Sequence, residues 1–438
     1  MPVSVNRFVR RGQSKPVFPS FPRFLRRALC PLLILTGPAL AGAVTAGPDP
    51  VGRGRYLVTA GNCASCHTAA AGAFMAGGVA FETPFGTLYS TNITPDPATG
   101  IGDWSEADFR AAMRHGVRPD GEHLYPAFPY TAYTRLTDDD LAAIWAYLRA
   151  VPPVASTPPE NALAFPFDQR PLLAAWKLLY HEPGPLQPDP DRSDAWNRGA
   201  YLVEALGHCS ACHSPRNRLG AEEAELRHAG GEYLDRVPGG DFRPWFAPNL
   251  TGHPTGLALW NHEDLVAYLA TGRNAFLEAF GPMNEVIMNS TRYLDPADID
   301  AMATYLKALP AAGGGAAADA PGEELMGRGR SLYNLHCGTC HLPSGEGDPE
   351  MAPRLNRGSL VVQAENPASL INVVLHGPEV AGADPDRQWL KPMKAYRYLL
   401  NDEEVAAVAT YIRNAWDNAA GVVSPAQVER QRRSNTGG

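Results

Sequence analysis

Apolar residues recur at helical spacing in three stretches of the chain. In the first, Leu141, Ile144 and Leu148 fall on one face of a helix, at positions i, i+3 and i+7. The same kind of face is built later by Ile299, Met302, Ala303 and Leu306, and again by Val405, Val408, Ala409 and Ile412. Residues that cap helices precede each stretch, namely Thr137 with Asp140, Asp295 with Pro296 and Asp298, and Asn401 with Glu404. The pattern predicts three amphipathic helices.

A shorter helical pattern lies upstream of each of these helices. The three copies are Arg53-Gly54-Arg55-Tyr56-Leu57, Arg198-Gly199-Ala200-Tyr201-Leu202 and Arg328-Gly329-Arg330-Ser331-Leu332. Each copy is followed within a few residues by a Cys-x-x-Cys-His motif, at 63–67, 209–213 and 337–341. The chain is therefore predicted to repeat one unit three times, with a first helix, the motif and a closing helix in each.

The motif is typical of a c-type haem attachment site. Two cysteines one helical turn apart, Cys63 and Cys66 in the first copy, can form thioethers to one porphyrin, and His67 then ligates its iron. The other copies supply Cys209, Cys212 and His213, and Cys337, Cys340 and His341. We therefore predict three covalently bound haem c groups, each with a histidine as axial ligand.

Metal binding and disulfide formation are the alternatives for a Cys-x-x-Cys pair. Structural zinc needs four ligands, usually from paired motifs at short separation, whereas the second and third motifs start 146 and 128 residues after the one before. A thioredoxin-like redox pair is expected beside a βαβ pattern, which the sequence does not show. Six of the seven cysteines lie inside the motifs, so a disulfide framework cannot coexist with three haems.

Residues 1–46 have the composition of a secretory signal peptide. Seven basic residues and no acidic ones precede an apolar run from Leu29 to Ala43 that ends in small residues. Pro31 breaks this run, and an uncleaved membrane anchor, which needs about 20 apolar residues, is the alternative. We expect the mature protein in the periplasm, on the periplasmic face of the inner membrane.

Charge excludes some classes of partner. The formal net charge of −8 becomes −15 when the seven basic residues of the signal peptide are removed. Such an acidic surface disfavours nucleic acid and anionic lipid as electrostatic partners. No other hydrophobic stretch approaches the length of a membrane span. Membrane association is therefore expected to be peripheral, through a partner or a small surface patch.

Composition divides the remaining chain into three domains. We place the first domain at 47–152, the second at 191–310 and the third at 323–418. Residues 153–190 form a Pro-rich linker with a short apolar helix from Pro171 to Tyr180, and residues 311–322 form an Ala/Gly-rich linker. Residues 419–438 are predicted to be a polar tail.

Two methionines are candidates for the sixth ligand of haem iron. Met283 in the second domain and Met393 in the third each follow a proline in a loop region before the closing helix. A methionine thioether favours ferrous haem and suits electron transfer. Filling a gap in the core is the alternative role for both, and Met351 is the second candidate in the third domain.

With these features the chain resembles the tri-haem cytochrome c subunit of membrane-bound bacterial dehydrogenases. The resemblance rests on four stretches, which are 208–217, 245–251, Gly281-Pro282-Met283 and 125–130. It implies an all-α fold of three tandem cytochrome c domains joined by the Pro-rich and Ala/Gly-rich linkers. It also implies that the first and closing helices cross steeply, with Gly54, Gly199 and Gly329 in close contact beside Tyr147, Tyr305 and Tyr411.

The first domain departs from the family's pattern. Phe128 occupies the place that carries the axial methionine in similar proteins, and a phenyl ring cannot ligate iron. Met113 is our candidate for the sixth ligand of the first haem. Met75, His115 and a five-coordinate iron are the alternatives.

The resemblance implies a role in electron transfer. Such a subunit takes electrons from a catalytic subunit of the flavin, quinone-cofactor or molybdenum type and passes them to ubiquinone or a terminal acceptor. The sequence has no Gly-rich dinucleotide fingerprint, so substrate oxidation is assigned to the partner. A multihaem peroxidase or oxidase that uses an open first haem is one alternative, and a free periplasmic electron shuttle is the other.

Overall fold

The structure is a computed structural model that describes residues 49–236, 242–313, 320–348, 350–378 and 393–434. The predicted signal peptide, residues 1–46, lies outside these residues, as does the middle of the predicted linker 311–322. The described residues belong to one unit of the chain.

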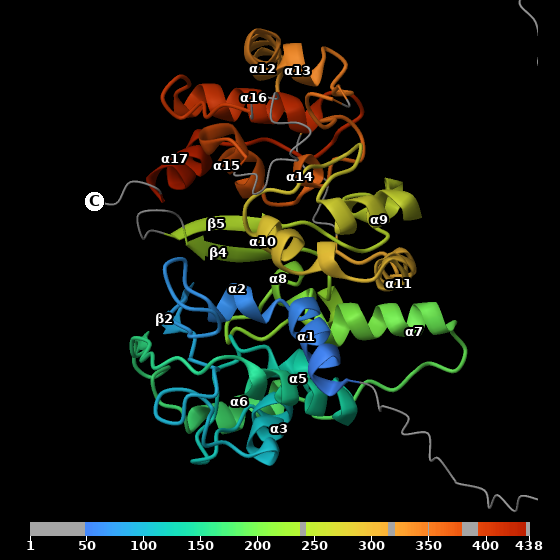
Figure 1. Cartoon of the computed structure of the whole chain (residues 1–438). Helices are drawn as coiled ribbons and strands as arrows, with labels where there is room; N and C mark the ends of the chain where they lie inside the picture. The colour runs from blue at the N-terminus through green and yellow to red at the C-terminus, as the bar shows by residue number, and fades with distance from the viewer. Residues whose placement is uncertain (1–48, 237–241, 314–319, 349, 379–392, 435–438) are drawn as a thin grey trace, which may run out of the picture. The chain divides into compact units, whose positions relative to one another are not determined.

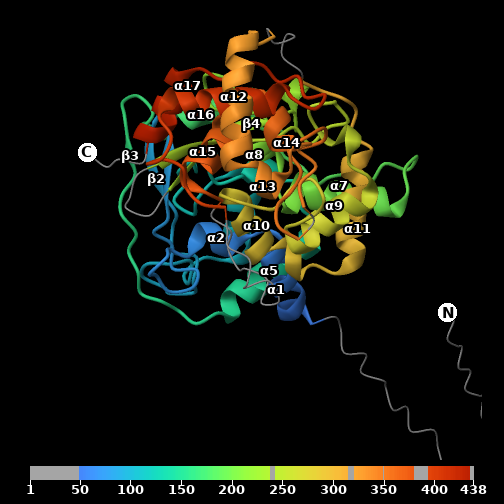
Figure 2. The same ribbon diagram turned by 90° about the horizontal axis from the view of Figure 1, so that it is seen from above.

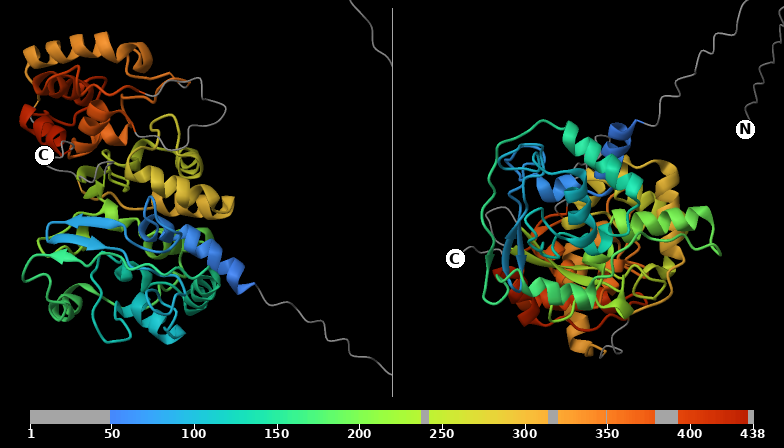
Figure 3. Two further views of the ribbon diagram at one scale, coloured as in Figure 1. Left: turned by 60° about the vertical axis from the view of Figure 1, so that its left-hand side comes forward. Right: turned by 90° about the horizontal axis from the view of Figure 1, so that it is seen from below.

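Three pairs of helices carry the cores. Helix α1 (Pro50–Ala60) packs on α5 (Asp138–Ala150), α7 (Asp194–Tyr201) on α11 (Pro296–Lys307), and α12 (Glu323–His336) on α16 (Asp402–Asn414). Figure 1 shows α1 beside α5, and the left view of Figure 3 shows the orange α12 along the red α16. The predicted amphipathic helices are confirmed, and their apolar faces are buried in the core.

A glycine lies at each helix crossing, as the resemblance implies. A methyl group added at Gly54 would overlap the carbonyl oxygen of Ala143 and lie 2.7 Å from Cβ of Tyr147. Gly199 and Gly329 stand in the same relation to the backbone of α11 and α16. Because the added atom would meet backbone, which cannot rotate away, only glycine permits this approach.

Helix caps confirm two of the three predicted pairs. The Thr137 side chain accepts from the backbone N–H of Asp140, and Asn401 and Glu404 form a complete capping box. The prediction is wrong for Asp295, whose side chain makes no cap bond at the start of α11. Pro296, the other predicted signal at this helix start, does occupy the first helical position, which its fixed backbone angle favours.

The expectation of an all-α fold is wrong, because the described residues contain two β-sheets. Strands β1 (Ala80–Thr83), β2 (Gly86–Tyr89) and β3 (Ala162–Leu163) form an antiparallel sheet in that order, with Ala80 opposite Tyr89 and Gly86 opposite Leu163. These strands are four residues long or shorter, so each is too short for an alternating pattern to appear in the sequence.

The second sheet is a longer antiparallel pair. Strand β4 (Gly231–Arg236) pairs with β5 (Phe242–Ala247), with Gly231 opposite Ala247. Strand β5 overlaps the 245–251 stretch, a family signature for which no strand was predicted. Helix α15 (Ala368–His376) of the third domain packs on β5, where Ser369 Oγ accepts from the Phe246 N–H at 2.9 Å and donates to its carbonyl oxygen at 3.0 Å.

The remaining helices are ten residues long or shorter. Helix α7 continues as a π-helical turn, η1 (Leu202–Leu206). The others are α2 (Cys63–His67), α3 (Glu106–His115), α4 (Tyr130–Tyr133), α8 (Ser210–His213), η2 (Ala224–Leu226), η3 (Leu257–Leu259), α9 (His262–Thr271), α10 (Pro282–Asn289), η4 (Thr291–Tyr293), α13 (Gly338–His341) and α14 (Leu360–Gln363).

The predicted linker and tail each hold one helix. Helix α6 (Leu172–Tyr180) contacts both neighbouring domains, because Lys177 donates to the His115 carbonyl at 2.6 Å and Trp176 Nε1 to the Leu219 carbonyl at 3.0 Å. In the tail, α17 (Pro425–Arg433) packs on α16, as Figure 2 shows, and buries Val428 completely. No described helix is long and apolar enough to cross a membrane.

Candidate functional site

The three motifs fold as short helices directly after the first helix of each domain. Helix α2 holds the first motif, and α8 and α13 hold most of the second and third. None of the six motif cysteines is in a disulfide, so each pair is available for thioether bonds to a macrocycle.

Each motif histidine is held through the same ring atom. The Nδ1 of His67 lies 2.7 Å from the Thr91 carbonyl oxygen, that of His213 lies 2.7 Å from the Pro248 carbonyl, and that of His341 lies 2.9 Å from the Pro353 carbonyl. A carbonyl oxygen can only accept, so Nδ1 carries the proton and Nε2 presents a lone pair.

Burial keeps these imidazoles neutral. It lowers the pKa of His213 to about 4, and it lowers the pKa of His67 and His341 in the same direction. A neutral imidazole with a free Nε2 is the form that ligates iron, and the hydrogen bond on Nδ1 fixes the orientation of the ring. The three histidines therefore fit the predicted haem ligands.

Two polar loops place the carbonyl groups that orient the first two histidines. Thr91 and Pro248 each precede an Asn-x-Thr sequence, in which the asparagine Oδ1 accepts from the threonine N–H at 2.9 Å in the first loop and 2.7 Å in the second. The amide of Asn92 also donates to Val154, and that of Asn249 to Ala312, just after each closing helix. The repeat of the Asn-x-Thr sequence points to two matching loops near the haem edges, but it does not show that the carbonyl group just before each repeat orients a histidine.

A large cavity lies beside the first motif. Its volume is about 2750 Å³, and Cys63, Cys66 and His67 line it. Apolar side chains, including Phe109 and Leu148, cover much of its wall, and Cys212 and Tyr233 of the second domain also border it. An apolar cavity that contains both cysteines and the histidine fits a covalently attached macrocycle.

The candidates for the sixth ligand of the first haem differ in their positions. Met113 lines the cavity and is 7% exposed, whereas Met75 is fully buried and does not border the cavity. Phe128 also lines the cavity and packs against Tyr133, with ring centroids 5.6 Å apart. His115 ends α3 and does not border the cavity. Met113 as a ligand stays a prediction.

The candidate ligand methionines of the other domains differ in burial. The expected loop position is wrong for Met283, which lies at the start of α10. Met283 and Met393 are partly buried against the hydrophobic core, whereas Met351 is 43% exposed. Ligation by Met283 and Met393 stays a prediction.

Comparison with known proteins identifies the family. The family model described as cytochrome c matches residues 51–152, 197–310 and 326–416. The chain belongs to the cytochrome c family. Members of this family bind haem c covalently, which agrees with the cysteine pairs and oriented histidines of the cytochrome described above.

Similar proteins are named as parts of dehydrogenases. The cytochrome is 43% identical to a subunit of nicotinate dehydrogenase from Pseudomonas putida over 377 residues, which cover 83% of the cytochrome and 30% of that protein. It is 38% identical to the cytochrome c subunit of alcohol dehydrogenase (quinone) of Gluconacetobacter polyoxogenes, covering 91% and 87% of the two chains. It is 36% identical to the fructose dehydrogenase cytochrome subunit of Gluconobacter japonicus, covering 92% and 88%.

Proposed function

We propose that this cytochrome carries three haem c groups and is the electron-transfer subunit of a dehydrogenase complex. The observation that carries the proposal is the threefold repeat of one arrangement, a cysteine pair followed by a neutral histidine whose Nδ1 is bound to a backbone carbonyl. The names of the similar proteins support the role of a subunit. Haem c, when bound, supplies reversible one-electron chemistry at its iron.

The chain's own residues would hold and tune these groups. Each cysteine pair would anchor one macrocycle, and the Nε2 of the following histidine would ligate its iron. Met283 in the second domain, Met393 in the third and Met113 in the first would supply the other protein ligand. The largely apolar walls of the cavity would lower the polarity around the first haem, which raises the cost of changing the charge on its iron.

The partner is a catalytic subunit of the flavin, quinone-cofactor or molybdenum type, and the acceptor is ubiquinone or a terminal oxidant. We place the complex in the periplasm, with the signal peptide directing export and peripheral contacts holding it at the inner membrane. Acidic surface charge disfavours nucleic acid as a partner.

The test is to isolate the complex from native membranes in mild detergent and to identify every polypeptide and cofactor in it. We expect a flavin, quinone-cofactor or molybdenum subunit whose substrate reduces all three haems. Haem staining and pyridine haemochrome should give three haems per chain, and two in the variant with Cys209→Ser and Cys212→Ser. A chain that purifies alone, turns over peroxide and binds carbon monoxide at its first haem would contradict the proposal.

A further inference from the structure

The first and second domains exchange a pair of matching hydrogen bonds. The hydroxyl of Tyr56 in α1 donates to Oδ2 of Asp298 in α11 at 2.6 Å. The hydroxyl of Tyr201 in α7 donates to Oδ2 of Asp140 in α5, also at 2.6 Å. In each case a tyrosine of one domain's first helix reaches the closing helix of the other domain.

The two bonds are embedded in matching surroundings. Each aspartate is also paired with an arginine of its own domain, Arg53 with Asp140 at 2.7 Å and Arg198 with Asp298 at 2.8 Å. Tyr56 stands three residues after Arg53, and Tyr201 stands three residues after Arg198. Equivalent residues of the first and second domains therefore make the same contacts across the interface, so the two domains are related by an approximate twofold symmetry.

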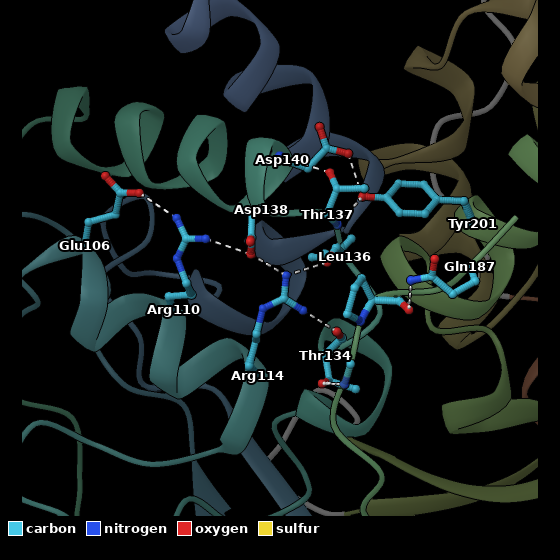
Figure 4. A network of polar contacts seen from close by, with 12 residues as sticks. Glu106, Arg110, Arg114, Thr134, Leu136, Thr137, Asp138, Asp140, Gln187 and Tyr201 are labelled. Atoms are coloured by element: carbon cyan, nitrogen blue, oxygen red, sulfur yellow. Dashed lines mark hydrogen bonds and ion pairs between the residues drawn. The ribbon is translucent and has the colours of Figure 1, made fainter.

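Each tyrosine also completes a helix cap in the other domain. The Tyr201 hydroxyl accepts from the backbone N–H of Thr137, the N-cap of α5, at 3.1 Å, and Figure 4 shows it pointing toward Thr137 and Asp140. The Tyr56 hydroxyl accepts in the same way from Asp295, the N-cap of α11, at 3.1 Å. One hydroxyl thus links the cap N–H to the carboxylate three residues later.

In two other helices of the protein the N–H of the N-cap residue donates directly to the carboxylate three residues later, with no hydroxyl between them. In α3 the Ser105 N–H donates to the Asp108 carboxylate at 2.9 Å, and in α16 the Asn401 N–H donates to Glu404 at 3.0 Å. The third domain has Ser331 at the position of the tyrosines, and its hydroxyl donates within α12 to the Gly327 carbonyl. The closing helix of the third domain is therefore capped by its own residues.

Burial and charge make the two bonds strong. Asp140 is 2% exposed and Asp298 is 9% exposed, so both carboxylates are largely shielded from bulk water. Although burial raises it, hydrogen bonds from Arg198 and Tyr56 keep the pKa of Asp298 below its usual value. Burial and the bond to Asp140 raise the pKa of Tyr201 to about 12, so this hydroxyl remains a donor at neutral pH.

We propose that Tyr56 and Tyr201 are positioning residues that lock the first and second domains into one two-haem unit, through a pair of bonds that the third domain, with Ser331 and a cap made by its own residues, does not share. The inference rests on the proposed electron-transfer function. The locked interface holds the first motif and Cys212 around one cavity. It also carries the hydrogen bonds from Ser290 to the Ala60 carbonyl and from Asn289 to Ser65. Fixed spacing between two haem sites is what repeated electron transfer between them requires.

The test compares the full-length haem-loaded protein with Tyr56→Phe, Tyr201→Phe and the double variant. These changes remove one hydroxyl each and keep the ring. We expect hydrogen exchange at the starts of α5 and α11 to accelerate about tenfold or more per lost bond, because a hydrogen bond to a charged acceptor is among the stronger kinds. We also expect weaker magnetic coupling between the first two haems in electron paramagnetic resonance spectra. A loss of rigidity inside one domain would not weaken this coupling, because it would leave the distance between the two haem sites unchanged.

Ser331→Ala is the matched control, since it removes a hydroxyl at the equivalent position of the third domain. We expect it to leave both readouts unchanged. The inference is overturned if the double variant shows wild-type exchange and wild-type coupling, or if Ser331→Ala changes them equally. Haem content and reduction by the native dehydrogenase are measured on the same samples. A wild-type protein that lacks the three haems or is not reduced by the dehydrogenase would contradict the proposed function and would leave the interface bonds a separate question.

Discussion

The helix crossing in the third domain allows a sharp test, because α12 carries two glycines in contrasting surroundings. Gly329 faces α16, where an added methyl would overlap the Ala407 carbonyl oxygen and lie 2.6 Å from Cβ of Tyr411. Gly327, two residues earlier in the same helix, has no atom of the described residues within 4 Å of that position. The same substitution at the two sites therefore separates packing from helix propensity.

The magnitudes follow from these surroundings. Alanine in place of glycine inside a helix gains about 1 kcal/mol from reduced backbone entropy in the unfolded chain. Gly327→Ala should therefore stabilise the third domain by up to about 1 kcal/mol. Overpacking against backbone costs up to ~3 kcal/mol. Gly329→Ala should therefore show a net loss of about 2 kcal/mol in the free energy of unfolding, and the two variants should differ by about 3 kcal/mol.

The measurement is native-state hydrogen exchange of amides in α12 and α16, since a chain with several domains does not unfold in one step. Amides of α1 and α5 serve as the internal reference and should not change. A Gly329→Ala protein with protection equal to or above that of Gly327→Ala would refute the close crossing.

Two further predictions concern charge and ligation. The carboxylate of Glu204 is 5% exposed and is hydrogen-bonded to His228 at 2.5 Å and to Tyr305 at 2.8 Å. Burial raises the pKa of Glu204, but these two bonds and the nearby arginines outweigh burial and lower the pKa to about 2. Because the folded pKa lies below the unfolded value of 4.5, its stabilisation is present above about pH 4.5 and is lost as the pH falls toward 2. Glu204→Gln should lower the free energy of unfolding at pH 7 by on the order of 3 kcal/mol and flatten the denaturation profile in that window, whereas an unchanged profile would contradict the shift. Met283→Leu should lower the reduction potential of one haem by on the order of 0.1 V in spectroelectrochemical titration, since a thioether favours ferrous iron, and identical potentials in the variant and the wild type would exclude Met283 as a ligand.

The closing helices and the haem motifs could be predicted from the sequence, because each depends on residues that are close together along the chain. The closing helix α16 could be predicted because its apolar face repeats every three or four residues and because Asn401 and Glu404 cap it within four positions. The motifs could be recognised for the same reason, since both cysteines and the histidine stand within five residues. The glycine crossings came from the family resemblance, and the structure confirmed them.

Long-range pairing decided what the sequence did not reveal. Strand β3 has two residues and pairs with β2 more than 70 positions earlier, so no periodic pattern could mark it. The carbonyl that orients His67 belongs to Thr91, and any backbone carbonyl has the same chemistry. Tyr56 looked like one more residue of a first helix, yet its hydroxyl caps α11, which begins 240 residues later. The sequence by itself determined the chemistry of the three haem motifs, and the tertiary structure decided which groups orient them and which two domains are joined, because those choices depend on distances between segments that are remote along the chain.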